Sequence, residues 1–351
     1  QAALAGVLLT VPLGNGYFWG TVNMLGDLSD PTDGLVTFLG PFYHVDMLVP
    51  LTAFGAVGVV TVAQWTRRLV TERVSADRVR PVLLTVALCG AALGGGAAVT
   101  TAAEPVSDNY EVTQQFEQAY EPFEERDLDN SLVLLPTPYG DWLNHPFQSV
   151  RNDPGFNGDT VYAMQHRQFE VIDAYPDRTY YRYVFRGEWV PYLGLPVEPR
   201  LQPVSVAEGE TVRTDVSAAV PEQAALVSMR LTSEGENDYA TVTGADRLDL
   251  QLSTDQNRTR LTGDGIDEQV GVPTPEDGSV TLIMFVDYGT GAGFEYRAEL
   301  PVAQTDGGVR TLTPRLEVCK DQRRCDGEAA YVPGAHRDGI GMNATTTAEN
   351  T

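Results

Sequence analysis

Two long runs without charged residues dominate the hydrophobic pattern of the first part of the chain. They are MLVPLTAFGAVGVVTVAQW (47–65) and PVLLTVALCGAALGGGAAVTTAA (81–103). Each has about the ~20 apolar residues that a helix needs to cross a bilayer, so both predict transmembrane helices. Residues 1–13, QAALAGVLLTVPL, lack the positive flank of a signal peptide and are similar to the end of a further span. We therefore expect the C-terminal part of a longer polytopic membrane protein.

The segment between the two runs is rich in arginine. Its five arginines are Arg67, Arg68, Arg73, Arg78 and Arg80. Short loops with such a positive excess lie on the cytoplasmic side of a membrane. Everything after residue 103 is then expected outside the cell, as the large external part of a multi-pass protein of the cell membrane.

By the same alternation, residues 14–46 form an external loop directly above the membrane. Its acidic residues and histidine are Asp27, Asp30, Asp33, His44 and Asp46. Such groups at a membrane rim could exchange protons or hold a cation near a lipid-linked substrate. Alternatively, they cap and turn an interfacial segment. No pair has the spacing of a known metal motif, so a divalent cation is compatible but unsupported, and neither a metal site nor a particular cofactor is predicted.

After an acidic helix or linker (104–130), the pattern changes to short apolar segments. SLVLLP (131–136), DTVYAM (159–164) and TYYRYVFR (179–186) predict strands, and QFEVIDAYP (168–176) predicts a helix that ends at its proline. This order predicts a small external α/β layer of Rossmann-like type over residues 131–196. Ligands in such layers lie beyond the carboxyl ends of the strands.

From residue 197 to residue 318, apolar and polar positions alternate in short segments that are separated by turns. That pattern predicts an all-β, sandwich-like domain. The remaining residues, 319–351, predict a disulfide loop followed by a disordered tail. The expected fold class is thus a membrane α-helical N-terminal part (1–103), an external α/β layer and a β-sandwich.

The charge is strongly acidic and unevenly distributed. The chain has 48 acidic and 24 basic residues, and residues 104–351 carry 42 of those acids and 19 of the bases, a net charge of −23. A surface of this kind is typical of proteins that work at very high salt, where screening reduces self-repulsion. It excludes nucleic acid as a partner, and nothing in the sequence indicates an oligomeric state.

Two of the three cysteines are close together in CKDQRRC, which has too few ligands for a zinc site. We predict a disulfide between Cys319 and Cys325 in an oxidising compartment. Asn257 and Asn343 begin NRT and NAT, which are acceptor sequences for N-glycosylation on an external face.

One stretch resembles a known family. NSLVLLPTPYGDWLNHPFQSVRNDPGFNGDTVYAM, followed by FEVIDAYPDRTYYRYVFRGEW, is similar to the external domain of haloarchaeal membrane proteins that resemble dolichyl-phosphate-mannose protein mannosyltransferases. The shared motifs are Val161 to Met164, Ala174 to Arg178 and Tyr180 to Tyr183. The resemblance covers roughly residues 14–190.

The resemblance implies a membrane glycosyltransferase, with a polyprenyl-phosphate-linked sugar and the lipid bilayer as partners. Transfer would occur at the external face by an inverting displacement, after an acidic residue of the first external loop deprotonates the acceptor. We expect that residue upstream of this chain, so activity of these 351 residues alone is not expected. The alternative is a non-catalytic, membrane-anchored surface protein that binds glycans or envelope partners.

Under the transferase hypothesis, the loop PTPYGDWLNHPFQSVRND (136–153) supplies the ligand contacts. Stacking on a sugar, hydrogen bonds to hydroxyls and contacts with phosphate are expected of Tyr139, Asp141, Trp142, Asn144, His145 and Arg151. Alternatively, prolines stiffen the loop and its aromatic residues plug the domain. His166 and His336 are expected to be surface or structurally satisfied histidines.

Overall fold

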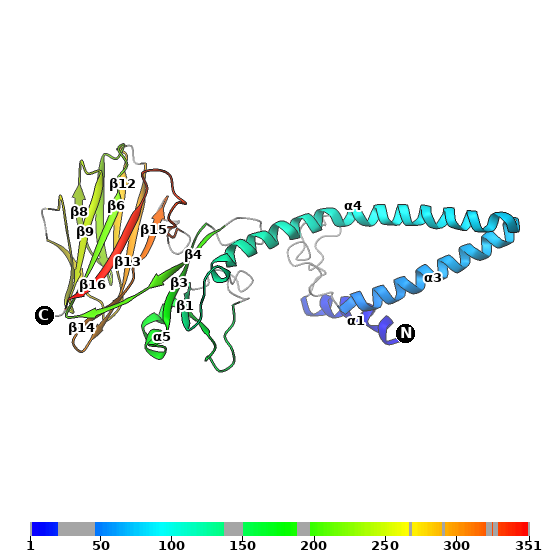
Figure 1. Cartoon of the computed structure of the whole chain (residues 1–351), viewed down its shortest axis with the longest axis horizontal. Helices are drawn as coiled ribbons and strands as arrows, with labels where there is room; N and C mark the ends of the chain where they lie inside the picture. Colours follow the sequence, from blue (N-terminus) through cyan, green and yellow to red (C-terminus); the bar gives the residue numbers. More distant parts are fainter. Residues whose placement is uncertain are drawn as a thin grey trace. The chain divides into compact units, whose positions relative to one another are not determined.

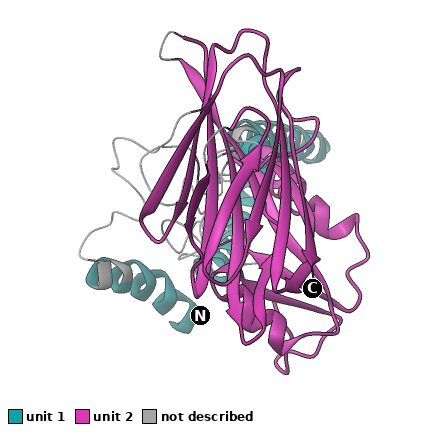
Figure 2. Cartoon of the chain, turned by 90° about the vertical axis from the view of Figure 1, so that its left-hand side faces the viewer, with its two compact units in different colours: residues 1–109 teal, residues 110–351 magenta. Residues whose placement is uncertain are grey.

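The computed structural model describes residues 2–19, 46–136, 150–187, 197–266, 269–289, 292–320, 325 and 329–349. The chain divides into two compact units, residues 1–109 and residues 110–351 (Figure 2). The described part consists of N-terminal helices, some of them apolar, followed by a β-rich part with several antiparallel pairings.

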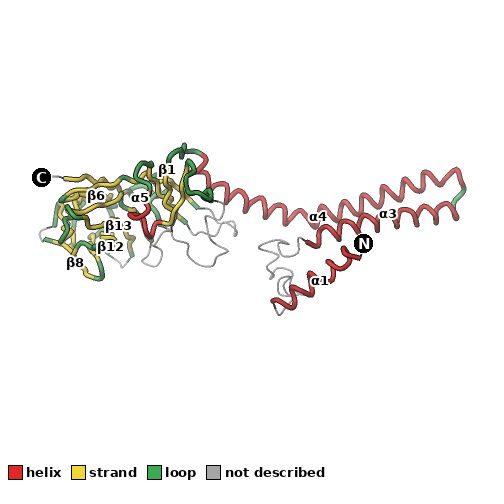
Figure 3. Tube along the Cα trace, turned by 90° about the horizontal axis from the view of Figure 1, so that it is seen from below, coloured by secondary structure: helices red, strands yellow, loops and turns green. Residues whose placement is uncertain are grey.

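The described residues of the first unit are mainly helical (Figure 3). Its helices are α1 (Ala2–Trp19), α3 (Leu48–Arg73) and α4 (Ala76–Glu124), and the last of these continues into the second unit. Both expected spans are therefore helical but longer than predicted, because the arginine-rich segment and the acidic segment that follow them are also helical. A short turn at Val74 and Ser75 joins α3 to α4 (Figure 1).

Two helices, α3 and α4, are long and apolar enough to cross a membrane. Their apolar side chains are not covered by protein: Val62 is 61% exposed, Leu88 63% and Leu93 76%. A continuous apolar surface of this kind is unfavourable in water and needs a lipid or protein environment. The helices thus indicate membrane association.

A four-stranded sheet begins the β-rich part. Its strands are β1 (Ser131–Leu135), β2 (Thr160–Met164), β3 (Thr179–Arg186) and β4 (Glu198–Val204), in the order β2-β1-β3-β4. β1 is parallel to both β2 and β3, whereas β4 is antiparallel to β3. A 3-10 turn (Gln165–Arg167) and α5 (Gln168–Ala174) connect β2 to β3. The predicted strands and helix are present, and the Rossmann-like description of the layer stays a prediction.

Alternation along β3 gives this sheet two different faces. Tyr181 and Tyr183 belong to the cluster that contains Ala119 of α4, and the Tyr183 hydroxyl donates a hydrogen bond to the Ala119 carbonyl at 2.6 Å. Tyr180 belongs to the cluster on the opposite face, with Phe169 of α5. The last turns of α4 and the helix α5 therefore cover opposite faces of the sheet, because side chains along a strand alternate between its two faces.

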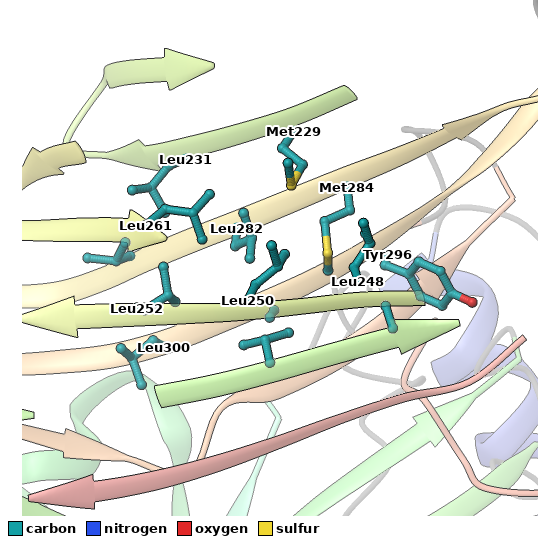
Figure 4. Close-up of a cluster of buried hydrophobic side chains, with 14 of the residues drawn as sticks. Met229, Leu231, Leu248, Leu250, Leu252, Leu261, Leu282, Met284, Tyr296 and Leu300 are labelled. Carbon is teal, nitrogen blue, oxygen red and sulfur yellow. The ribbon is translucent and has the colours of Figure 1, made fainter. Parts of the chain in front are cut away.

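Two further sheets share one hydrophobic core (Figure 4). One contains β6 (Thr211–Ala219), β9 (Arg247–Thr254), β10 (Arg258–Gly263), β11 (Val270–Pro273) and β16 (Met342–Glu349), in the order β11-β10-β9-β6-β16. The other contains β5 (Val206–Gly209), β7 (Leu226–Ser233), β8 (Glu236–Val242), β12 (Asp277–Asp287), β13 (Gly293–Thr305), β14 (Gly308–Leu312) and β15 (Arg315–Cys319).

The strict alternation of the sequence explains this core. In β9, Leu248, Leu250 and Leu252 are buried, while the residues between them face outwards or are half-buried. They pack with residues such as Leu282 and Tyr296 of the other sheet. Burial of a leucine or tyrosine side chain contributes roughly 1.5–3 kcal/mol relative to an exposed one, so the shared core is the main source of stability here.

Two predicted boundaries differ from the structure. β4 pairs with β3 along its whole length, so the four-stranded layer extends to Val204 and does not end at residue 196. Residues 342–349, which were expected in a disordered tail, form β16 and pair with β6 from Met342 to Glu349. Composition alone misled here, because the alternating threonines of this segment suit a strand at a sheet edge.

A buried arginine joins the four-stranded sheet to the sandwich. Arg182 of β3 is fully buried, and its guanidinium donates hydrogen bonds to the Thr313 carbonyl at 2.9 Å and to Gln168 Oε1 at 3.3 Å. Burial, together with the nearby positive charge of Arg315, lowers the pKa of Arg182 to about 9. The side chain therefore remains charged at neutral pH and its charge must be compensated within the protein.

We predict that Arg182→Met lowers the free energy of unfolding by about 2–4 kcal/mol, because the Thr313 carbonyl and nearby carboxylates lose their buried partner. Urea denaturation of the full chain in detergent, followed by near-ultraviolet circular dichroism, measures the loss. Arg247→Met is the control, since Arg247 pairs with Asp249 at the surface and is 62% exposed. Equal stabilities of the two variants would contradict a structural role for Arg182.

Candidate functional site

The carboxyl ends of β1 and β2 lie at the same edge of the four-stranded sheet. The two strands are parallel and Leu135 is opposite Met164, so the chain leaves both strands side by side. The loop that begins at Pro136 and the turn that begins at Gln165 therefore start at one place. In α/β sheets this edge is the usual position of a ligand.

A cleft of about 310 Å³ lies at this edge, between the turn after β2 and the sandwich. Its lining is formed by Gln165, His166, Gln168, Phe169, Asp277, Gly278, Ser279, Glu299 and Arg315. The volume is at the lower end of the roughly 300–1,000 Å³ that small-molecule sites occupy. All of these residues belong to the second compact unit, so the cleft is formed within one body.

Glu299 and Arg315 of the cleft lining belong to an alternating set of charges on β13 and β15, which we call the charge ladder: Glu295, Arg297, Glu299, Arg315 and Glu317. Direct cross-strand neighbours have opposite charge, because Arg297 is opposite Glu317 and Glu299 is opposite Arg315. Arg315 contacts Glu317 at 3.2 Å and Glu299 at 3.5 Å. Such pairs stabilise a sheet, and here they also fix the direction of the charged groups.

Gln168 connects the cleft to the buried arginine beneath it. The amide oxygen of Gln168 accepts a hydrogen bond from Arg182, so the side chain that lines the cleft is held at one end. The ladder has two arginines and three glutamates. Arg182 adds a third positive charge, so these partly buried charged side chains together have no net charge. A neutral set of fixed donors and acceptors avoids the cost of an unpaired buried charge.

Two amides, a hydroxyl, two carboxylates, an imidazole and a guanidinium line the cleft. These groups donate and accept hydrogen bonds in about equal measure, which is the pattern that hydroxyl groups of a ligand require. The wall is not strongly cationic, so a neutral polyol fits it better than a free phosphate. The candidate function of the site is therefore recognition of a hydroxylated ligand such as a sugar.

The predicted disulfide is present: Cys319 of β15 is bonded to Cys325, with a Cα–Cα distance of 5.4 Å. Glu295 lies with these two cysteines in a buried group. Since the sulfur atoms are bonded to each other, they do not provide the thiolates that a metal ion would need.

The residues predicted from the sequence fall mostly outside the described part of the chain. This is true of Tyr139, Asp141, Trp142, Asn144 and His145 in the loop after β1, and of Asp27, Asp30, Asp33 and His44 in the loop after α1. Two are described: Asp46 is exposed shortly before α3, and Arg151 is exposed at the end of the loop. The structure therefore brings none of the predicted contact residues into the cleft among those that it describes.

The described end of that loop is a tightly bonded turn. The Asp153 carboxylate accepts hydrogen bonds from the backbone N–H groups of Gly155, Asn157 and Gly158, which lower the pKa of Asp153, Gly155 having the largest effect. The Asn152 amide bonds to both backbone groups of Tyr162 in β2. For residues 152–158 these contacts support the alternative of a structural loop, since the Asn152 and Asp153 side chains form hydrogen bonds with backbone groups.

Residues of the motifs that suggested a family resemblance also stabilise the four-stranded sheet. Arg178 donates hydrogen bonds to the carbonyls of Ser131, Gly158 and Asp159, at the start of β1 and before β2. The Tyr180 hydroxyl donates to carbonyls of the turn at Tyr175 and Pro176. These residues therefore hold the amino ends of the strands together, opposite the edge at which the cleft lies.

Sequence reasoning missed His166 and the charge ladder. His166 is exposed, as expected of a surface histidine, but its place in the lining of the cleft was not predicted. The signal for the ladder was present, because EYRAE and RLE each carry alternating charges at every second position. Charged residues at every second position predict that each segment is a strand with one charged face. That the two faces form ion pairs follows only when both strands are known to be neighbours in one sheet.

Comparison with known proteins finds a match over part of the chain only. Residues 131–300 match the model of a family described as a domain of unknown function, DUF7846. No curated protein and no solved structure matches the chain significantly. The matched stretch begins with the first residue of β1 and ends within β13, so it includes every residue of the cleft lining except Arg315.

The position of α5 beside the cleft depends on an ion pair whose strength varies with pH. Arg310 of β14 donates two hydrogen bonds to the Asp173 carboxylate, one of them at 2.9 Å, and they lower the pKa of Asp173. A lowered pKa stabilises the folded state above the unfolded value of about 3.9, and the stabilisation is lost as the pH falls below it.

We predict that wild type loses about 0.5 kcal/mol more stability than Asp173→Asn between pH 5 and pH 3, a small value because the carboxylate is 55% exposed. Urea midpoints measured at each pH give the difference. In an Arg310→Met background the Asp173→Asn substitution should no longer change the pH dependence, and a change that persists there would assign the effect to other groups.

Proposed function

We propose that this chain belongs to a membrane glycosyltransferase that takes sugar from a polyprenyl-phosphate donor at the external face of the cell membrane. In this proposal the cleft beside β2 holds the sugar, and the sandwich is an accessory domain that forms one wall. The observation that carries the proposal is the cleft itself, lined by amide, hydroxyl, carboxylate and guanidinium groups at the carboxyl edge of β1 and β2.

The topology of the four-stranded sheet supports the placement of the ligand. Its three parallel strands and the connection through α5 follow the Rossmann-like plan that we propose for this layer. That plan gives the edge beyond β1 and β2 a functional role in many proteins. The Asp153 turn and Arg178 stabilise the other parts of the layer and leave the side chains of this edge available for a ligand.

The helical part supports a membrane location. Two helices are long and apolar enough to span a bilayer, and the turn between them is flanked by arginines. Positive residues favour the cytoplasmic side, which would place the second unit outside the cell. The disulfide agrees with an oxidising compartment, and the charge of −24 agrees with work at high salt.

A second candidate function is a non-catalytic, membrane-anchored protein that binds glycans of the envelope. One observation favours it: a groove of about 590 Å³ lies on the outer face of β6, β9 and β16. Its polar lining includes Asp215, Ser217, Asp249, Gln251 and Thr345. An open polar groove of this volume across several strands suits a glycan of more than one unit better than a single donor sugar.

We predict that the full chain in nanodiscs binds at least one member of a panel of polyprenyl-phosphate hexoses, and that Gln165→Ala with His166→Ala weakens binding about tenfold. Loss of one or two ligand hydrogen bonds corresponds to roughly this factor. Titration calorimetry measures the affinity. Tyr239→Ala on β8 is the control, because this exposed side chain lies outside the cleft lining.

The two candidate functions differ in the outcome. Selective binding of the lipid-linked hexose with loss in the double variant supports the transferase proposal. Binding of free oligosaccharide without any preference for the lipid-linked form supports the glycan-binding protein. If the double variant bound the ligand with unchanged affinity, the cleft would not be the ligand site under either candidate function.

The proposed orientation predicts the labelling of single cysteines in intact cells. In a Cys89→Ala background, Ser75→Cys between α3 and α4 should resist a membrane-impermeant maleimide, whereas Ser228→Cys on β7 should react. Both serines are exposed, so the difference reports the side of the membrane. Labelling of the Ser75→Cys variant in intact cells would contradict the orientation, and labelling of both variants after lysis is the positive control.

A further inference from the structure

A second and larger pocket lies on the sandwich next to the disulfide, and it is separate from the cleft. It has a volume of about 640 Å³ and is lined by Arg186, Pro221, Gln223, Tyr288, Gly293, Phe294, Val318, Lys320, Ala335, His336, Arg337, Asp338 and Ile340. None of these residues lines the cleft. We call it the cationic pocket, after its arginines and lysine.

The charge of this pocket is opposite to that of the chain. Three cationic side chains, Arg186, Lys320 and Arg337, line it together with one acidic residue, Asp338, and Glu198 pairs with Arg186, which leaves one positive charge in excess among the described residues. The whole chain has twice as many acidic as basic residues, and Lys320 is its only lysine. A positive site of this kind attracts an anion, and it does so selectively because the surrounding surface repels one.

One of the cations is positioned by the protein. The Arg186 guanidinium donates to Glu198 at 2.7 Å and to the Ala335 carbonyl at 2.7 Å, and its side chain is 30% exposed. Both contacts use Nη1, so the described partners leave the other end of the fork to the pocket. Arg186 thus links β3 to the segment that carries His336 and keeps a fixed positive charge in the wall.

His336 adds a buried polar atom. Its ring stacks on Tyr331 with 5.2 Å between centroids and an interplanar angle of 18°. Nε2 is buried and has no hydrogen-bond partner among the described residues. Burial, followed by the nearby charge of Arg186, lowers the pKa of His336, so the imidazole is neutral at pH 7. Leaving this nitrogen unpaired is costly, which favours a contact with a ligand hydroxyl that displaces the atoms covering Nε2.

The remaining lining is aromatic and apolar. Tyr288 and Phe294 lie with 6.3 Å between their ring centroids, and Phe294 is only 7% exposed because it packs on Tyr296 of the core. Aromatic side chains of this kind offer a flat surface to a ring. The pocket therefore combines cations, a hydroxyl partner and a ring-binding surface.

From this combination we infer that the cationic pocket binds an acidic monosaccharide unit, a pyranose that carries a carboxylate or sulfate group. The acidic group contacts Lys320 and Arg337, a hydroxyl pairs with His336, and the ring lies against the aromatic lining. The inference does not rest on the proposed function of the cleft. Lys320, His336 and Arg337 also lie outside the stretch that matches the family of unknown function.

The test is direct binding of monosaccharides to the full chain in nanodiscs, measured by saturation-transfer NMR with the probes glucuronate, glucose and benzoate. Glucuronate should bind at least tenfold more tightly than glucose, which lacks the charge, and than benzoate, which lacks the hydroxyls. Measurements at two salt concentrations should show weaker binding at the higher one, because screening reduces the contribution of the exposed Lys320.

Three variants locate the site. Lys320→Gln and Arg337→Gln should each reduce glucuronate affinity about fivefold, and His336→Phe, which retains a ring beside Tyr331, should reduce it by a similar factor. Arg213→Gln is the control, since Arg213 is paired with Glu349 at the surface. Near-ultraviolet circular dichroism verifies that each variant is folded.

Three results would overturn the inference: no saturable binding of glucuronate, equal binding of glucuronate and glucose or benzoate, or the same affinity in the folded pocket variants as in wild type. Binding that survives the pocket variants but is lost with Gln165→Ala and His166→Ala would assign the acidic sugar to the cleft. The failure of the cationic pocket is therefore distinguishable from failure of the cleft.

Discussion

The buried guanidinium of Arg182 is the contact on which the joining of the two β layers depends. It comes from the middle of β3, and it donates hydrogen bonds to Gln168, which lines the cleft, and to the Thr313 carbonyl, which lies between β14 and β15. A charged group in this position is costly to desolvate, so the surrounding carboxylates of the charge ladder are needed to keep it there. Without Arg182, the four-stranded sheet and the sandwich would keep their apolar contacts and more exposed polar contacts such as Arg310 with Asp173, but would lose this buried polar connection.

The cost of burying charged groups also explains why we expect a function where the four-stranded sheet meets the sandwich. The ladder of β13 and β15 turns its apolar neighbours, such as Tyr296 and Leu300, into the sandwich core and its charged residues towards the four-stranded sheet. Charged side chains that are fixed in this way are already partly desolvated. They can therefore pair with ligand hydroxyls at lower entropic cost than long side chains on an open surface.

Much of the fold followed from the pattern of apolar residues. The strands at 131, 160 and 179, the helix at 168 and the disulfide were predictable, because period and spacing decide them locally. The extension of the layer to Val204 and the strand at 342 were not, because pairing with a distant strand decides whether such a segment is ordered. For the site, a cluster of aromatic and charged residues drew attention to the loop at 136–153. The residues of the cleft are instead scattered over Gln165, Asp277 and Arg315, and only the fold brings them together.

The pairing of β16 with β6 has a consequence for how the domain is made. β6 ends at Ala219, but its neighbour on one side begins only at Met342. During synthesis the edge of β6 stays unpaired until the whole sandwich sequence has emerged, and an unpaired strand edge can pair with another chain. Exposed acidic residues such as Asp215 on β6 provide a charge that opposes such joining during that interval. Completion of this sheet is therefore the last step of its assembly, and a chain truncated before Met342 would present an open edge to its neighbours.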